Sequence, residues 1–107
     1  MTYTVQFMSA GEYGAIIRFL SAAKEQGLTA RGVHDGDEFV RCGSFDDVVQ
    51  VVDSVQDSTI RFSDADGKTA GSAYVVLGNA EDGSEVIADY TMTPALDAAW
   101  NTAFPIR

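Results

Sequence analysis

The spacing of apolar residues changes along this chain from every second position to every third or fourth. Apolar and polar side chains alternate over 3–7, which predicts a half-buried strand at the start of the chain. Apolar residues then recur at helical spacing over 13–23. Ser9 and Glu12 form the pattern of a capping box before this stretch, and Gly27 follows it. The second segment is therefore predicted to be a helix.

Five further segments have the short apolar patterns of strands. A tight turn with an Asp-Gly step separates the first two, and similar turns precede the last two, so antiparallel pairing is predicted. The predicted strands cover 28–33, 38–42, 60–63, 69–77 and 85–90.

Two more helices are predicted, one after Ser44 and one near the end of the sequence. Ser44 is an N-cap residue before an apolar stripe over 45–55. Four valines in this stripe are β-branched, so a strand over 48–52 is the alternative. Thr93 precedes a proline that suits the first helical position, and the apolar residues of 96–103 share one helical face.

Together these elements predict a single α+β domain over 1–107. Their order is β-α-β-β-α-β-β-β-α, which favours a mostly antiparallel sheet of about six strands with two to three helices on one face. A chain of 107 residues has the usual size of one domain.

Two aromatic positions in the predicted helices are of interest. Trp100 has Phe104 one turn away and is predicted to anchor the core, with an aromatic platform as the alternative. Phe19 lies off the main apolar stripe, so it is predicted to be partly exposed and available for a contact.

The cellular compartment is predicted from the lack of a membrane-spanning segment or a secretory signal in the sequence. The longest apolar runs, such as 74–77, are far shorter than the roughly 20 residues of a membrane-spanning helix, and the N-terminus does not resemble a secretory signal. Cys42 is the only cysteine, which excludes an intramolecular disulfide. We therefore expect a cytoplasmic protein without a membrane segment.

The sequence shows no recognisable catalytic, cofactor or metal motif. The stretch 67–69 lacks the earlier glycine of a phosphate-binding loop, and Asp64 and Asp66 lack the later glutamate of a calcium loop. His34 is the only histidine, and a pair with Cys42 is the one nucleophilic arrangement that the sequence allows. We rank that enzyme hypothesis last and predict a protein that is not an enzyme and holds no cofactor or metal.

Charge is the unusual property of this chain. Asp and Glu number 16 against 7 Lys and Arg, giving a formal net charge of -9. The basic residues are scattered along the sequence, so no basic patch for nucleic acid is evident. A negative surface instead favours encounter with a basic partner, although acidity also serves solubility alone. The acids predicted to contact such a partner are Asp35, Asp37, Glu38, Asp46, Asp47, Asp64 and Asp66.

The second half of the chain resembles a known group of proteins. The segment 76–90, followed by the helix with Trp100, is similar to small acidic bacteriophage proteins of unassigned role. Small phage proteins include inhibitors of host defence, such as anti-CRISPR and anti-restriction proteins. The resemblance implies a phage accessory protein in the host bacterial cytoplasm. It favours an inhibitor that presents a DNA-like negative surface to a basic nucleic-acid-processing protein; the alternative is an assembly protein that forms a homo-oligomer.

Overall fold

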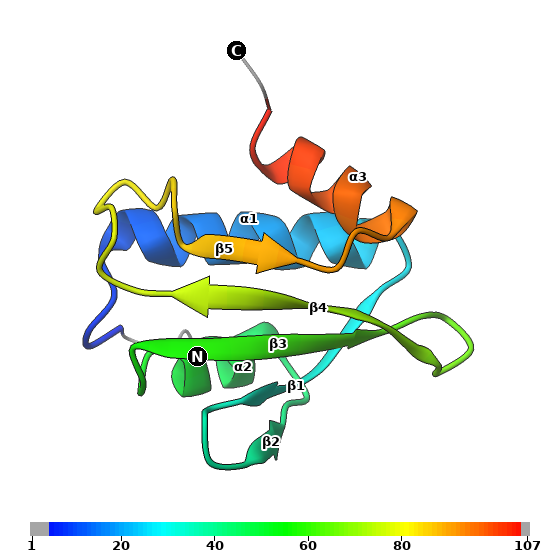
Figure 1. Ribbon diagram of the computed structural model, residues 1–107, viewed down its shortest axis with the longest axis horizontal. Coiled ribbons are helices and arrows are strands. Elements are labelled where there is room, and N and C mark those ends of the chain that lie inside the picture. The colour runs from blue at the N-terminus through cyan, green and yellow to red at the C-terminus, as the bar shows by residue number, and fades with distance from the viewer. Residues whose placement is uncertain (1–4, 106–107) are drawn as a thin grey trace.

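The computed structural model describes residues 5–105 of the chain (Figure 1). In this range the chain forms three helices and one five-stranded sheet. The helices are α1 (Ala10–Glu25), α2 (Phe45–Val52) and α3 (Pro94–Ala103). The strands are β1 (Thr29–His34), β2 (Phe39–Arg41), β3 (Asp57–Ser63), β4 (Thr69–Val76) and β5 (Ile87–Tyr90).

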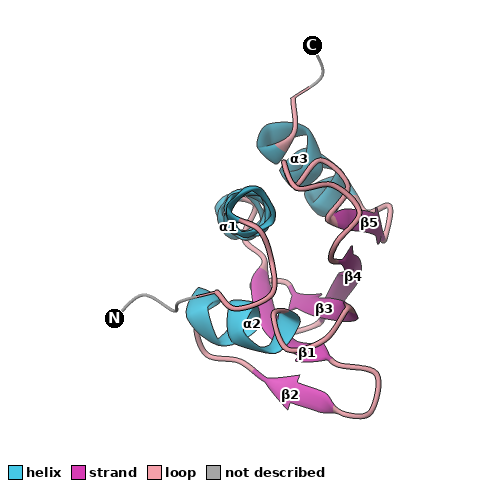
Figure 2. Cartoon of the chain, turned by 90° about the vertical axis from the view of Figure 1, so that its left-hand side faces the viewer, coloured by secondary structure: helices cyan, strands magenta, loops and turns pink. Residues whose placement is uncertain are grey.

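The sheet is antiparallel throughout, with the strand order β2-β1-β3-β4-β5. Figure 2 shows that all three helices lie on one side of it, which leaves the other face of the sheet open. The predicted α+β class is therefore confirmed. The later strands and their turns also follow the prediction, with shifts of a few residues at their ends.

The strand predicted over 3–7 is wrong for the described part of that segment. Residues 6–8 form bends, and residues 5–8 pair with no described strand. The carboxylate of Asp53 accepts the backbone N–H groups of Gln6, Phe7 and Met8 at 2.6, 2.9 and 2.8 Å. Because a side chain satisfies these donors, the segment needs no neighbouring strand. Residues 1–4 lie outside the described range.

Helix α1 begins at the predicted capping box. The Ser9 hydroxyl accepts the Glu12 N–H at 3.0 Å, and Glu12 Oε1 accepts the Ser9 N–H at 2.9 Å. The second oxygen of the same buried carboxylate accepts the N–H of Gly78 at 2.7 Å. One glutamate therefore both caps the helix and fixes the loop that leads from β4 to β5.

Helix α2 confirms the helical reading of the valine stripe. Ser44 caps it by accepting the N–H of Asp47, and Val48, Val49 and Val52 are completely buried. Burial of three valine side chains outweighs the small loss of helix propensity that β-branching causes. Helix α3 likewise begins at Thr93 with a proline in its first turn, as predicted.

The core lies between the helices and the inner face of the sheet, and Phe19 is at its centre. The prediction of a partly exposed Phe19 is wrong, since its side chain is completely buried. Its ring contacts Phe62 edge-on at 6.1 Å and stacks with Phe104 at 6.4 Å, measured between ring centres. Trp100 stacks in turn on Tyr90 at 5.4 Å and is partly buried, in agreement with a packing role. The helical period alone did not show that α1 is covered on two sides, by the sheet and by α3.

None of the helices within the described range combines the length and the apolar character needed to cross a bilayer.

Candidate functional site

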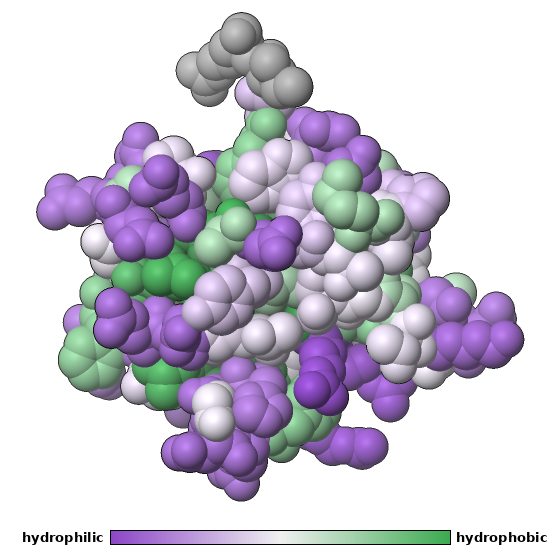
Figure 3. Space-filling model, in the orientation of Figure 1, coloured by the Kyte–Doolittle hydropathy of each residue, from purple (hydrophilic) through white to green (hydrophobic). Residues whose placement is uncertain are grey.

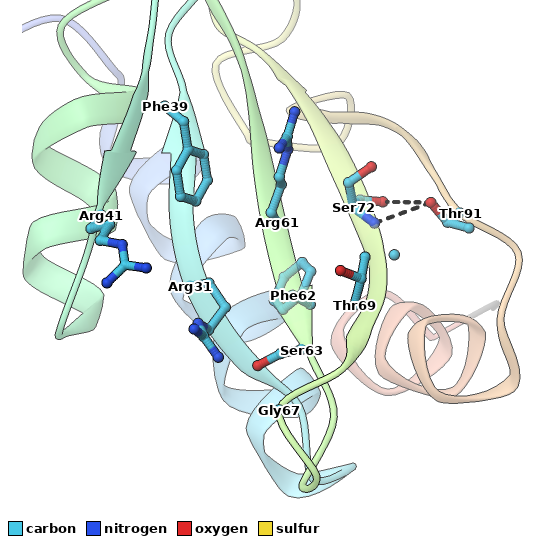
Figure 4. Close-up of a pocket in the computed structure, with 11 residues that line it drawn as sticks. Arg31, Phe39, Arg41, Arg61, Phe62, Ser63, Gly67, Thr69, Ser72 and Thr91 are labelled. Carbon is cyan, nitrogen blue, oxygen red and sulfur yellow. Dashed lines mark hydrogen bonds between the residues drawn. The ribbon is translucent and has the colours of Figure 1, made fainter.

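The open sheet face carries a shallow pocket of about 480 Å³. It spans four adjacent strands and reaches the segment that follows β5 (Figure 4). In the space-filling view of this face, residues of intermediate hydropathy gather in the middle and on the right, hydrophobic surface shows on the left, and strongly hydrophilic residues lie mostly toward the rim (Figure 3). The pocket is lined by Arg31, Phe39, Arg41, Arg61, Phe62, Ser63, Gly67, Thr69, Gly71, Ser72 and Thr91.

Three arginines from three neighbouring strands contribute to this pocket. Arg41 of β2 and Arg61 of β3 both pair in register with Gly32 of β1, so their side chains leave the sheet on the same face. The register of β1 against β3 shifts between Ala30 and Gly32, and this irregularity turns the intervening Arg31 toward the same pocket. The sequence suggested scattered basic residues, whereas the fold gathers three of the seven.

Gly32 makes room for an aromatic ring among the arginines. A Cβ at this position would lie 2.6 Å from Cζ of Phe39 and would collide with the carbonyl oxygen of Val40. The ring of Phe39 therefore lies over the glycine, with 37% of the side chain exposed. The Arg61 guanidinium carbon lies 5.2 Å from the ring centre, within the range of a cation-π contact. Arginine and aromatic surface are thus adjacent.

Hydroxyl groups form the opposite wall of the pocket. Thr91 Oγ1 accepts the N–H of Ser72 at 3.0 Å, and the Thr91 N–H donates to the Ser72 carbonyl at 2.9 Å. Close packing of Gly71 against Leu96 and Thr91 holds this wall against helix α3. Ser63 and Thr69 add two more hydroxyl side chains. The wall therefore offers hydrogen-bonding groups on a well-supported backbone.

The arginines of the pocket have no acidic partner in the described part of the chain. Arg61 contacts Phe39, and none of the three forms an ion pair with a described carboxylate. Arg41 also reaches a second depression that Asp35 and Asp47 line, without pairing with either. A guanidinium cannot lose its charge at physiological pH and matches the geometry of phosphate and carboxylate groups. The site is chemically suited to bind an anion.

The acids predicted to contact a partner lie in three segments of the chain. Asp35, Asp37 and Glu38 lie in the β1–β2 turn, whereas Asp64 and Asp66 lie in the β3–β4 turn at the opposite end of the sheet (Figure 1). Asp46 and Asp47 lie in the first turn of α2. The fold brings Asp35 and Asp47 to the edge of one depression, whereas the β3–β4 turn with Asp64 and Asp66 lies apart from both.

Asp35 and Asp64 have local structural roles. Asp35 Oδ1 accepts the N–H groups of Glu38 and Asp37, both at 2.9 Å, and these bonds hold the pKa of Asp35 below its ordinary value. Asp64 Oδ1 binds the N–H groups of Asp66 and Lys68 in the same way. Such bonds stabilise the turns themselves.

One end of the sheet nevertheless collects exposed carboxylates, and we call it the acidic end. The β1–β2 turn, the start of β3 and the loop from β4 to β5 all lie there (Figure 1). Tyr74 donates its hydroxyl to Asp57 Oδ2 at 2.5 Å, which raises the pKa of the Tyr74 hydroxyl. The acidic end consists of Asp35, Asp37, Glu38, Asp57, Glu81, Asp82 and Glu85.

Cys42 and His34 do not form a nucleophilic pair. His34 pairs with Phe39, so it shares the open face, whereas Cys42 is an odd number of positions from Phe39 and faces the helix side. Burial, helped by the negative charge of Asp47, raises the pKa of the Cys42 thiol. His34 Nδ1 accepts the N–H of Gly36 at 3.1 Å. Among the described residues, no group of three or more His, Cys, Asp and Glu side chains could hold a metal ion.

The sequence did contain one signal for the arginine pocket. Arg41 and Arg61 alternate with inward-facing apolar residues, so both were predictable as outward-facing. Strand order was not predictable, because adjacent strands in space need not be consecutive in sequence, and β1 separates β2 from β3. No sequence pattern indicated the register shift of β1 that turns Arg31 toward the pocket.

Comparison with known proteins adds no assignment. No family model, curated protein or solved structure matches this chain. The observations that bear on the function are the geometry of the pocket and the distribution of charge.

Proposed function

We propose that this protein is a binding protein that holds an anionic ligand in the arginine pocket of its open sheet face. The observation that carries the proposal is the set of Arg31, Arg41 and Arg61, which line one pocket without a described acidic partner in a chain of net charge -9. Even in such an acidic chain, three arginines without a described ion pair create a local positive potential, which attracts an anion.

The composition of the pocket favours binding over catalysis. Its described lining consists of arginine, hydroxyl, glycine and phenylalanine residues, and it includes no His, Cys, Asp or Glu to serve as a general base. Arginine and hydroxyl donors recognise oxygen anions without needing to exchange a proton with them. The pocket therefore suits a ligand that is retained unchanged.

Calorimetric titration with inorganic phosphate tests this proposal directly. We expect saturable binding that weakens with added salt, because the contacts are charged and exposed. Arg31→Gln and Arg41→Gln should each weaken binding by about tenfold or more, the loss of one charge-assisted hydrogen bond. Arg18→Gln is the matched control, since Arg18 is an exposed arginine of α1 that contacts Phe104 outside the pocket. Equal binding by all four proteins would contradict the proposal.

The acidic inhibitor of a basic nucleic-acid-processing protein is a second proposal. What favours it is the acidic end, whose segments contain no Lys or Arg among their described residues. Pull-down from bacterial lysate at low and high salt tests it, with Asp37→Asn and Glu38→Gln combined as the variant and Asp66→Asn as the control from the other end. A basic protein retained only at low salt, and lost in the combined variant alone, would support the inhibitor.

Recovery of the protein itself without a partner would favour the alternative, a homo-oligomeric assembly protein. In that case the measured mass should increase with concentration. The phage origin suggested by the resemblance also stays a proposal, and a salt-dependent host partner would support it.

A further inference from the structure

The arginine pocket presents two different surfaces side by side. Arg31 and Arg41 project on one side of Phe39, while Arg61 lies against its ring (Figure 4). The first surface carries two positive charges, and the second combines an apolar ring with a planar guanidinium. A ligand that satisfies both surfaces needs an anionic group and a flat ring in one molecule.

The size of the pocket limits that ligand to a small one. Its volume of about 480 Å³ falls within the range of small-molecule sites, roughly 300–1,000 Å³. A long polyanion would extend beyond the three arginines over a chain whose net charge of -9 repels it. A compact anion meets the arginines and avoids most of that repulsion.

Phosphate suits the donors better than a carboxylate does. The guanidinium groups of Arg31 and Arg41, together with the hydroxyls of Ser63 and Thr69, offer more donors than two carboxylate oxygens can accept. A phosphate monoester has three acceptor oxygens and a charge between about -1.5 and -2 at pH 7. It therefore uses more of the positive charge that the pocket supplies.

We infer that the ligand is a phosphate monoester that carries a planar ring, the chemistry of a mononucleotide. This inference rests on the proposed anion-binding function. The phosphate binds Arg31 and Arg41, and the ring stacks on the exposed part of Phe39 beside Arg61. Gly32 is essential to this arrangement because only a residue without a side chain leaves room for the Phe39 ring.

The experiment compares four probes by calorimetry on the full chain: adenosine monophosphate, ribose 5-phosphate, adenosine and a ten-nucleotide single strand. We expect adenosine monophosphate to bind about tenfold more tightly than ribose 5-phosphate, the contribution of one ring stacked on an aromatic side chain. Phe39→Ala should abolish that margin, because it removes the ring and keeps Arg31 and Arg41. Phe7→Ala is the control for loss of an exposed phenylalanine, because its ring is 74% exposed away from the pocket. Circular dichroism of each variant checks that it is folded.

The outcomes separate this inference from the proposed function. Equal affinity for adenosine monophosphate and ribose 5-phosphate would overturn the planar-ring ligand and leave the anion site standing. Tighter binding of the ten-nucleotide strand than of the mononucleotide would also overturn it, in favour of a nucleic-acid surface. If no phosphate-bearing probe binds, the anion-binding function and the inference fail together.

Discussion

Oδ1 of Asp53 accepts the backbone N–H of Met8 at 2.8 Å, across 45 positions of sequence. The same carboxylate binds the N–H groups of the two preceding residues. Asp53 is almost completely buried at the end of α2, so these bonds are shielded from water. This side chain thereby ties the segment before α1 to the helix layer.

Removal of this carboxylate should destabilise the whole domain. Asp53→Ala leaves backbone donors without their acceptor in a shielded position, and we expect a loss of about 3 kcal/mol in the free energy of unfolding. Urea denaturation followed by circular dichroism measures it. Asp47→Ala is the control, because it removes an exposed carboxylate that accepts only the N–H of Gly43 and should cost about 1 kcal/mol or less. Equal losses in the two variants would show that burial of Asp53 has no special importance.

The contrast between Asp53 and Ser9 shows what the sequence could and could not predict. Ser9 and Glu12 are three residues apart, so their capping box follows from a local rule, and α1 begins where that rule places it. The bonds to Asp53 join segments that are distant in the sequence. No local pattern distinguishes this aspartate from the exposed aspartates of the chain. The alternation over 3–7 therefore predicts a strand that the described residues do not form.

The same distinction applies to the candidate site. Turns with Asp-Gly steps were predicted because glycine at positive φ is a local requirement, and Gly36 and Gly67 have φ values of 106° and 82°. The gathering of Arg31, Arg41 and Arg61 depends on strand order and on an irregular register, which are tertiary properties. The charge of the chain was evident from the sequence, but its division between an arginine pocket and an acidic end was not.

Phe19 should be one of the most sensitive positions of the core. Its ring is completely buried between Phe62 and Phe104, so Phe19→Ala creates a cavity and should cost about 3–5 kcal/mol. Phe7→Ala, at an exposed ring, should change the free energy of unfolding by less than about 0.5 kcal/mol. Thermal and urea unfolding of the two variants tests the comparison. A mild effect at Phe19 would mean that the packing of α1 against α3 and the sheet is looser than described.

Tyr90 should titrate at unusually high pH. Burial first, and then its hydrogen bond to Asp97 Oδ1 at 2.8 Å, raise the pKa of the Tyr90 hydroxyl to about 12. Because the folded pKa lies above that of an unfolded tyrosine, about 10, the protonated hydroxyl stabilises the fold below pH 10 and this contribution disappears as the pH rises from 10 to 12.

Ultraviolet absorbance of tyrosinate measures this titration. The wild-type protein should show a late step near pH 12 that is absent in Tyr90→Phe. Tyr74 is the internal comparison, since its pKa is also raised, in this case by the hydrogen bond to Asp57. A Tyr74→Phe variant should keep the late step of Tyr90, and loss of that step in both variants would contradict the assignment.

Gly32→Ala should damage the arginine pocket and the stability of the sheet together. The new methyl group would collide with the Val40 carbonyl and with the Phe39 ring, so β2 or the ring must move, at a cost of about 1–3 kcal/mol. Gly43→Ala is the matched control, because a Cβ there would meet only the Asp47 carboxylate, at 3.7 Å. Phosphate affinity, measured under conditions where both variants are folded, should fall in Gly32→Ala and remain at the wild-type value in Gly43→Ala. Unchanged affinity in Gly32→Ala would show that the position of β2, and with it of Arg41, is not what makes the pocket bind phosphate.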